Sequence, residues 1–175
     1  MNANQSSNLI VAGLLAAAFL LVQPTAQAAT TLTWDANTNG APSDGSGTWH
    51  GGNTWWDGTN DVAWANGNAA VIGTNTVGDY SIVLDSPVTA TTVTFKTNSY
   101  TLSGSTLTES GITLNNGVSA TINCSLSTPG SGITLGNGGS TLTLGGGFAS
   151  TTGNPPWKGA SATSSTINIT NGTYT

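Results

Sequence analysis

From residue 69 onward, apolar and polar residues alternate in short runs that are separated by Gly, Asn and Ser. Val93 and Phe95 share one parity within their run, and Ile112 and Leu114 do so in a later one. Alternation with a period of two predicts strands that bury one face, and the small polar residues between the runs predict turns. The pattern therefore predicts an all-β chain.

One strand-forming phrase recurs. Ile112-Thr-Leu-Asn-Asn-Gly117 returns 21 positions later as Ile133-Thr-Leu-Gly-Asn-Gly138. A recurrence at this period, with no helical periodicity between the copies, is typical of a β-solenoid, in which each coil buries its apolar face against the next. We expect Ile112 to stack on Ile133, and Asn116 on Asn137, with strands about 4.8 Å apart.

Residues 29–73 differ from the rest because they hold five of the six tryptophans. An open first coil would expose unpaired strand edges that invite association, and bulky aromatic rings could cover it. We therefore predict that 29–73 is a tryptophan-rich N-terminal cap. Parity places Trp56 inward, together with Trp34 and Trp64, and Trp55 outward.

Residues 74–175 are predicted to form the solenoid coils, interrupted by an inserted loop over 148–162. Pro155 and Pro156 lie in that stretch, and two successive prolines cannot occupy a central strand. The chain stops at Thr175 on a strand-like stretch, whereas solenoids usually end in an atypical capping unit. We therefore expect the C-terminus to be truncated.

The N-terminus is predicted to be a signal peptide covering residues 1–28. Leu9–Val22 is an apolar run of 14 residues, shorter than the roughly 18–20 residues of a membrane-spanning helix. Ala26-Gln27-Ala28 supplies the small-x-small pattern of a cleavage site, although no Lys or Arg precedes the run. Cleavage between Ala28 and Ala29 would leave a mature chain without a membrane span.

Charge excludes one class of partner. Charged residues make up 5% of the chain, the formal net charge is −5, and Lys96 and Lys158 are the only basic side chains. Nucleic acid is therefore not an expected partner, because neutralising phosphates requires clustered Lys and Arg. Cys124 is the single cysteine, so no intrachain disulfide can form, and its parity predicts a buried side chain.

The order of the motifs resembles a known group. A signal peptide, Trp34-Asp35, a Gly- and Trp-rich stretch, Tyr80-Ser-Ile-Val-Leu84 and Tyr100-Thr-Leu-Ser-Gly104 follow one another. This order is similar to the N-terminal portion of bacterial surface proteins with autotransporter-associated β-strand repeats. The resemblance implies a passenger-like, right-handed parallel β-helix, secreted or displayed at the cell surface. It also implies a structural or adhesive role, with surface polysaccharide or other surface proteins as partners, and brings no catalytic residues.

Asp35-Ala-Asn-Thr-Asn-Gly40 matches the opening of a calcium loop, which makes Asp35, Asn37 and Asn39 candidate ligands. The position that would carry the bidentate Glu of an EF-hand is Ser46, and no helix flanks the loop. We favour an Asx-rich surface turn, and no cofactor is expected.

Exposed tryptophans could instead stack on sugar rings, with Trp49, Trp55 and Trp157 as candidate glycan contacts. The alternative to a structural or adhesive module is therefore a carbohydrate-binding module or a β-helix enzyme that degrades polysaccharide.

Catalytic groups are sparse. His50 could act as a base with Asp57 or Asp61, but no G-x-S-x-G nucleophile motif occurs. Asp57 with Asp61, or Asp79 with Asp85, could form the carboxylate pair of a glycosidase. A lyase would also need Lys or Arg to stabilise developing negative charge, and Arg is absent. The sequence therefore favours an exported, non-enzymatic structural or adhesive surface module.

Overall fold

The computed structural model describes residues 28–74, 76–97, 99–128, 132–150, 157–159 and 164–171. These residues form strands and turns, and no helix occurs among them. The predicted signal peptide lies outside this range except for Ala28. Ala28 and Ala29 are exposed and lie just before the first strand.

Three sheets contain all the described strands. Sheet A has eight, in the spatial order β17 (Trp157–Gly159), β14 (Ile133–Leu135), β11 (Ile112–Leu114), β8 (Val93–Phe95), β5 (Ala69–Ile72), β1 (Thr31–Trp34), β3 (Trp55–Trp56) and β4 (Asp61–Val62). Sheet B has six: β18 (Thr166–Ile169), β15 (Thr141–Leu144), β12 (Ser119–Ile122), β9 (Tyr100–Gly104), β6 (Tyr80–Leu84) and β2 (Gly47–Thr48). Sheet C has four: β16 (Phe148–Ser150), β13 (Leu126–Thr128), β10 (Leu107–Glu109) and β7 (Val88–Ala90).

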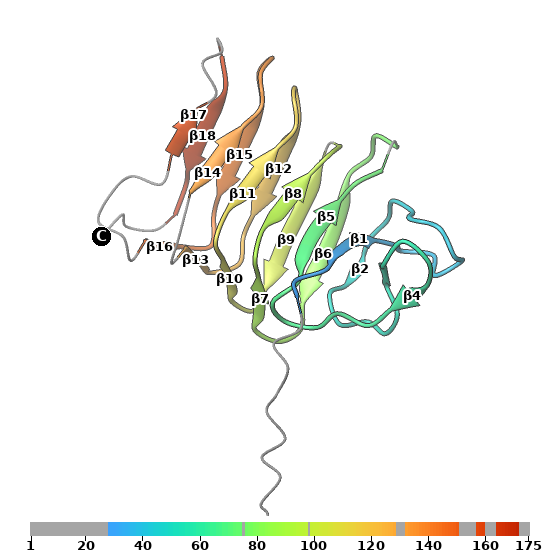
Figure 1. The fold of residues 1–175 in the computed structure, drawn as a ribbon. Coiled ribbons are helices and arrows are strands. Elements are labelled where there is room, and N and C mark those ends of the chain that lie inside the picture. Colours follow the sequence, from blue (N-terminus) through green and yellow to red (C-terminus); the bar gives the residue numbers. More distant parts are fainter. Residues whose placement is uncertain are drawn as a thin grey trace, which may run out of the picture.

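From β5 onward, successive strands of the chain belong to different sheets, and each of these strands pairs in parallel with its equivalent in the next coil. Thus β8, β9 and β10 form one coil, and β11, β12 and β13 form the next. The coils stack in a row from the tryptophan-rich end to β17 and β18 (Figure 1). The fold is therefore a parallel β-solenoid, as the 21-residue recurrence predicted.

The predicted register is confirmed. Ile112 pairs with Ile133 and Leu114 with Leu135. Two residues further along each turn, the backbone N–H of Asn137 donates to Oδ1 of Asn116 at 2.8 Å. Each phrase ends on a glycine with positive φ, +70° at Gly117 and +80° at Gly138. These stacked turns require a left-handed conformation, which explains why both copies keep Gly.

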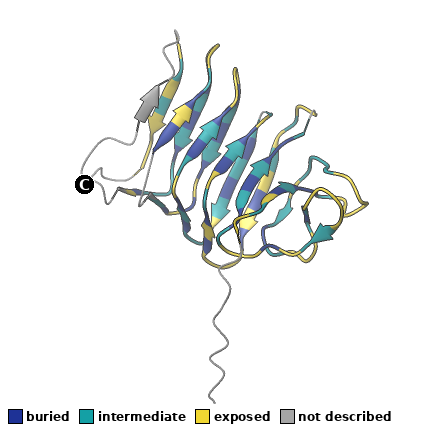
Figure 2. Cartoon of the chain, viewed as in Figure 1, coloured by how far each residue is buried: buried dark blue, intermediate teal, exposed yellow. Residues whose placement is uncertain are grey.

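The interior is one continuous column of apolar side chains from the three sheets, and its members alternate with half-buried or exposed residues along each strand (Figure 2). Phe95, Tyr100, Leu102 and Ile112 are all fully buried. Cys124 lies in this column with 1% of its surface exposed, and burial raises the pKa of its thiol to about 11. The prediction that Cys124 is buried is confirmed.

Two predicted boundaries do not coincide with the strands. β1 and β5 lie within 29–73 but belong to sheet A, so the first coil starts inside the predicted cap. Within 148–162, β16 and β17 extend sheets C and A, because Phe148 continues the inward column above Leu126. The loop predicted there therefore does not cover these two segments, and Pro155 and Pro156 lie outside the described residues. Among the described residues, no helix is long and apolar enough to cross a membrane.

Candidate functional site: the tryptophan cluster and the polar outer faces

Four indole rings pack together at the N-terminal end of the solenoid. The antiparallel pairing of β1 with β3 places Trp34 opposite Trp55, and their ring centroids lie 5.3 Å apart at 75°. Trp49 and Trp64 pack on Trp55, with centroids 4.7 Å from it in both cases. We call Trp34, Trp49, Trp55 and Trp64 the tryptophan cluster.

The tryptophan cluster is buried and joins the solenoid core directly. Three of its N–H groups are hydrogen-bonded: Trp34 Nε1 donates to the Gly45 carbonyl, Trp55 Nε1 to the Trp49 carbonyl, and Trp64 Nε1 to Asn66 Oδ1. Burying these N–H groups is therefore compensated, and the rings close the end of the apolar column. The tryptophans cap the solenoid, as predicted.

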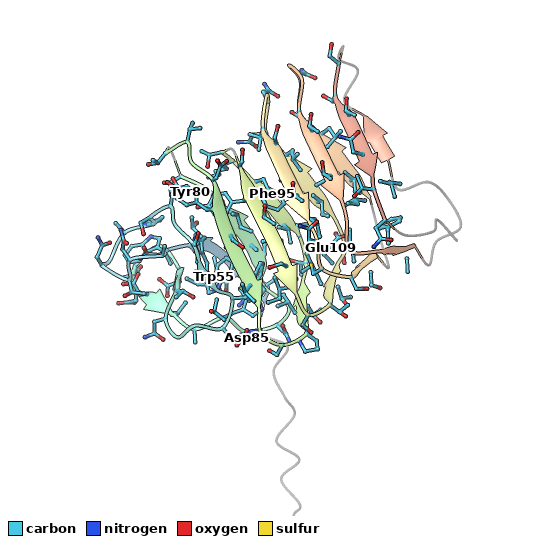
Figure 3. All side chains as sticks on the ribbon, turned by 180° about the vertical axis from the view of Figure 1, so that it is seen from behind. Trp55, Tyr80, Asp85, Phe95 and Glu109 are labelled. Atoms are coloured by element: carbon cyan, nitrogen blue, oxygen red, sulfur yellow. The ribbon has the colours of Figure 1, made fainter. Side chains whose placement is uncertain are left out.

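The predicted orientation of the adjacent pair was wrong. Trp55 is fully buried and Trp56 is only half-buried. Register decides this, because Trp55 pairs with the inward Trp34 while Trp56 pairs with the outward Thr33. The sequence prediction carried the inward–outward alternation of side chains from β1 to β3 as if the chain between them were extended. The turn between these strands interrupts that alternation, so the prediction gave the opposite orientation for Trp55 (Figure 3).

Burial also removes two candidate glycan contacts. Trp49 and Trp55 are fully buried, so neither ring can stack on a sugar. Trp157 belongs to β17, and its side chain lies outside the described residues. The tryptophans whose side chains are described thus provide packing and do not form a coplanar exposed platform.

Asp44 fastens the 36–46 loop to the solenoid. Its carboxylate accepts hydrogen bonds from Thr74 N–H, the Thr74 hydroxyl, Thr76 N–H and the Tyr100 hydroxyl, at 2.7–3.0 Å. Partial burial opposes ionisation, but these donors together lower the pKa of Asp44. The loop is therefore held in place by an ionised carboxylate.

The predicted calcium loop has the form of an Asx turn. Asn37 N–H donates to Asp35 Oδ1, as does the Ser43 hydroxyl, and Asp35 is fully buried. The side chains of Asn37 and Asn39 are exposed. The alternating-ligand set Asp35, Asn37 and Asn39 is therefore not assembled around one point.

His50 pairs with a carboxylate that sequence position did not indicate. Its Nδ1 lies 2.7 Å from Asp85 Oδ1 and 3.2 Å from Ser86 Oγ (Figure 3 labels Asp85). A Ser-His-Asp triad needs the serine and the carboxylate on opposite ring nitrogens. Here both contact Nδ1, so no proton relay is formed, and the contact with His50 lowers the pKa of Asp85.

Asp57, Asp61 and Asp85, three of the carboxylates suggested for glycosidase pairs, hold other contacts. Asp57 Oδ1 accepts from the N–H groups of Thr59 and Asn60 and closes a local turn. Asp61 Oδ2 accepts from Gly40 N–H, and the Asp61 carboxyl lies beside that of Asp35 as well as within electrostatic reach of Asp57. Neither suggested pair lines a deep groove within the described part of the chain.

One ionisable residue that the sequence reasoning missed is Glu109. It lies inside the solenoid, 1% exposed, and no donor in the described residues reaches either carboxyl oxygen (Figure 3). Burial raises its pKa to about 8, so the carboxyl is mostly protonated at neutral pH. Its shared parity with Leu107 in Leu107-Thr108-Glu109 was a signal that could have identified it.

The outward faces carry columns of hydroxyl groups. On sheet A, Thr94, Thr113 and Thr134 occupy one row across three coils. On sheet B, Thr101, Thr121 and Thr143 do the same. Neighbouring strands lie about 4.8 Å apart, so each column is a regular array of hydroxyls and methyls.

A shallow depression of about 520 Å³ adjoins the sheet A column. The polar residues in its lining are Lys96, Thr113, Asn115, Asn116, Thr134 and Asn137, and Leu114, Leu135 and Gly136 complete it. It lies where β11 and β14 pass into their stacked turns. This surface offers hydrogen-bond donors and acceptors, and the residues that line it include no carboxylate.

Comparison with known proteins gives one informative similarity. The chain resembles an autotransporter adhesin. It is 36% identical over 96 residues to the "Adhesin BmaC autotransporter" of Brucella suis biovar 1 (strain 1330), a match that covers 50% of this chain and 3% of that protein. Together with the solenoid, this similarity supports the resemblance to passenger-like β-helical autotransporter proteins. No protein-family profile matches the chain. No solved structure matches it either.

Proposed function

We propose that this chain is an exported structural and adhesive module of a longer β-helical surface protein, and that it acts without catalysis. The observation that carries the proposal is the sheet A outer face, where Thr94, Thr113 and Thr134 are stacked and the last two line a shallow depression. The similarity to an autotransporter adhesin supports the same function. It also supports secretion or display at the bacterial surface.

A stacked solenoid suits adhesion for a physical reason. Each coil is held by ladder hydrogen bonds and by a continuous core, so the outer side chains are fixed before a partner arrives. A fixed array loses little conformational entropy on binding. Many weak hydroxyl and amide contacts, repeated over successive coils, then add up through multivalency.

Low charge contributes to the same role. The chain carries nine charged residues out of 175, with Lys96 beside the depression. Hydrogen bonds and van der Waals contacts would therefore provide most of the binding energy, and binding would depend only weakly on salt.

The proposal is tested by displaying the full chain on a non-adherent bacterium through an unrelated translocator. We expect several-fold more cells to be retained on host-cell monolayers than with the translocator alone. Ile122→Asp, displayed at the same density, is the matched control, because a charge in the core should abolish the fold and with it the gain.

Retention equal to that of the empty translocator contradicts the adhesive function. Retention that is lost only after enzymatic removal of glycans from the monolayer assigns a carbohydrate partner. Retention that survives glycan removal assigns a protein partner.

A further inference from the structure

Three polar side chains lie together on the face of β1, β3 and β4 that points away from the tryptophan cluster. Trp34, Trp55 and Val62 share a row facing the core. Asp35, Thr54 and Asp61 are their chain neighbours and so point to the opposite face. The N–H of Asp35 donates to the Thr54 carbonyl at 2.9 Å and continues the ladder.

The 36–46 loop covers this face. Ala36 N–H donates to the Ser43 carbonyl, the Ser43 hydroxyl donates to Asp35 Oδ1, and Gly40 N–H donates to Asp61 Oδ2 at 2.9 Å. Each carboxylate thus uses one oxygen to hold the loop.

The remaining oxygens have no donor. Asp35 Oδ2, Asp61 Oδ1 and Thr54 Oγ1 are all buried, and no hydrogen-bond donor in the described residues reaches any of them. Asp35 as a whole is 0% exposed. Buried polar atoms are rarely left unpaired, because each one loses its water without compensation.

The two carboxyl groups also face each other. Asp61 lies close enough to Asp35 for the two side chains to interact directly. Two facing carboxylates need either a shared proton or a cation between them.

We propose that Asp35 and Asp61 bind a calcium ion beneath the 36–46 loop, with the Thr54 hydroxyl as a third ligand. Calcium accepts irregular sets of oxygen ligands and keeps some of its waters. The ligand set differs from the sequence-predicted one, since only Asp35 is common to both. A second acidic side chain from β4 replaces Asn37 and Asn39.

Access and affinity follow from the surroundings. A polar depression of about 710 Å³, lined by Thr38, Gly51, Gly52, Asn53, Asn60 and Asp61, opens to solvent beside the Asp61 side chain. Only two carboxylates converge, and the described residues contain no group of three or more His, Cys, Asp or Glu suited to a metal. The site should therefore be weak, with a Kd on the order of 10⁻⁴–10⁻³ M, in the range of extracellular calcium modules.

Terbium luminescence tests the site, because Trp56 pairs directly with Asp61 and lies on the same face. Excitation of tryptophan should give saturable Tb³⁺ emission that Ca²⁺ displaces. Asp61→Asn should weaken Tb³⁺ binding at least tenfold. Thr54→Val, which removes only the hydroxyl ligand, should weaken it by a smaller factor. Asp79→Asn removes the same charge at an exposed position outside the site and should leave binding unchanged.

Folding is checked separately by circular dichroism, and Asp61→Asn is preferred to Asp35→Asn because Asp61 is only half-buried. No saturable emission from the folded wild-type chain overturns the proposal, as does equal emission from folded Asp61→Asn. A wild-type chain that binds no Ca²⁺ and shows a carboxyl proton shared by Asp35 and Asp61 at neutral pH in NMR spectra also overturns it.

Discussion

At the scale of single residues, Glu109 stands out because folding removes its carboxyl group from water, which surrounds it in the unfolded chain. Its side chain lies among apolar neighbours inside the solenoid, with no donor for either oxygen among the described residues. A carboxyl group there is tolerated only because it keeps its proton. Stability should therefore depend on pH in part through this residue.

Glu109 predicts that stability falls as pH rises from about 4.5 to about 8. Its ordinary pKa is 4.5 and burial raises it to about 8, so across this window the native chain keeps a proton that the unfolded chain releases. The unfolded state then binds fewer protons, and the free energy of unfolding drops by about 1.4 kcal/mol per pH unit.

Urea unfolding at several pH values measures this slope. Glu109→Gln removes the titrating group, so its slope should be shallower by the Glu109 contribution. Asp44 and Asp85 do not interfere, because their lowered pKa values place their titration below the window. A variant with the same slope as the wild type would show that Glu109 is not the cause.

Inward and outward positions of neighbouring coils give a second prediction at this scale. Ile122→Ala and Leu135→Ala should each cost about 2–5 kcal/mol, because they remove large buried side chains. Thr121→Ala and Asn123→Ala should cost far less, since these residues are half-buried and exposed. Thermal melts that rank the four in the reverse order would contradict the assignment of the core face.

At the scale of elements, the tryptophan cluster decides whether the first coil is protected. Trp49 and Trp64 are buried against Trp55, so replacing either with Ala should cost about 3–5 kcal/mol. The exposed end should also promote association between molecules. Trp56→Ala is the control, because Trp56 is only half-buried.

Unfolding curves and sedimentation velocity check both effects. Equal loss of stability in Trp56→Ala and Trp49→Ala would contradict a cap built from the inward rings. Stable, monomeric Trp49→Ala and Trp64→Ala variants would contradict it as well.

Within a strand, sequence parity was a sound guide. It predicted the inward column of Ile112 and Leu114 and the burial of Cys124, because alternation is a local property of the extended backbone. The same parity argument, applied to Leu107, would also have predicted that the Glu109 side chain points inward. The recurrence of one phrase predicted the register of β11 on β14, since identical side chains stack when coils repeat.

Across irregular turns the same reasoning failed. The orientation of Trp55 and the contact between Asp35 and Asp61 depend on how β1, β3 and β4 pair, and turn geometry sets that pairing. No periodic signal in residues 35–61 encodes it. The contact of His50 with Asp85 likewise joins residues 35 positions apart, through the pairing of β2 with β6.

At the scale of the whole molecule, the solenoid turns a simple sequence into an ordered surface. The inner side of each coil is used for stability, which leaves the threonine columns and stacked turns free for contacts. The tryptophan cluster closes one end, and the remaining outer surface is polar and nearly uncharged. In the proposed function, the sheets provide the adhesive contacts and the tryptophan cluster protects the end of the solenoid.

The most direct test compares two threonine columns on chains displayed at the cell surface. Thr94, Thr113 and Thr134 are changed together to Val on sheet A, and Thr101, Thr121 and Thr143 on sheet B. Valine keeps the shape and β-propensity of threonine but lacks the hydroxyl, so both variants should fold. Cell retention is then measured. A several-fold loss for the sheet A variant alone is the expected result, and wild-type retention of a folded sheet A variant would contradict the proposed adhesive face.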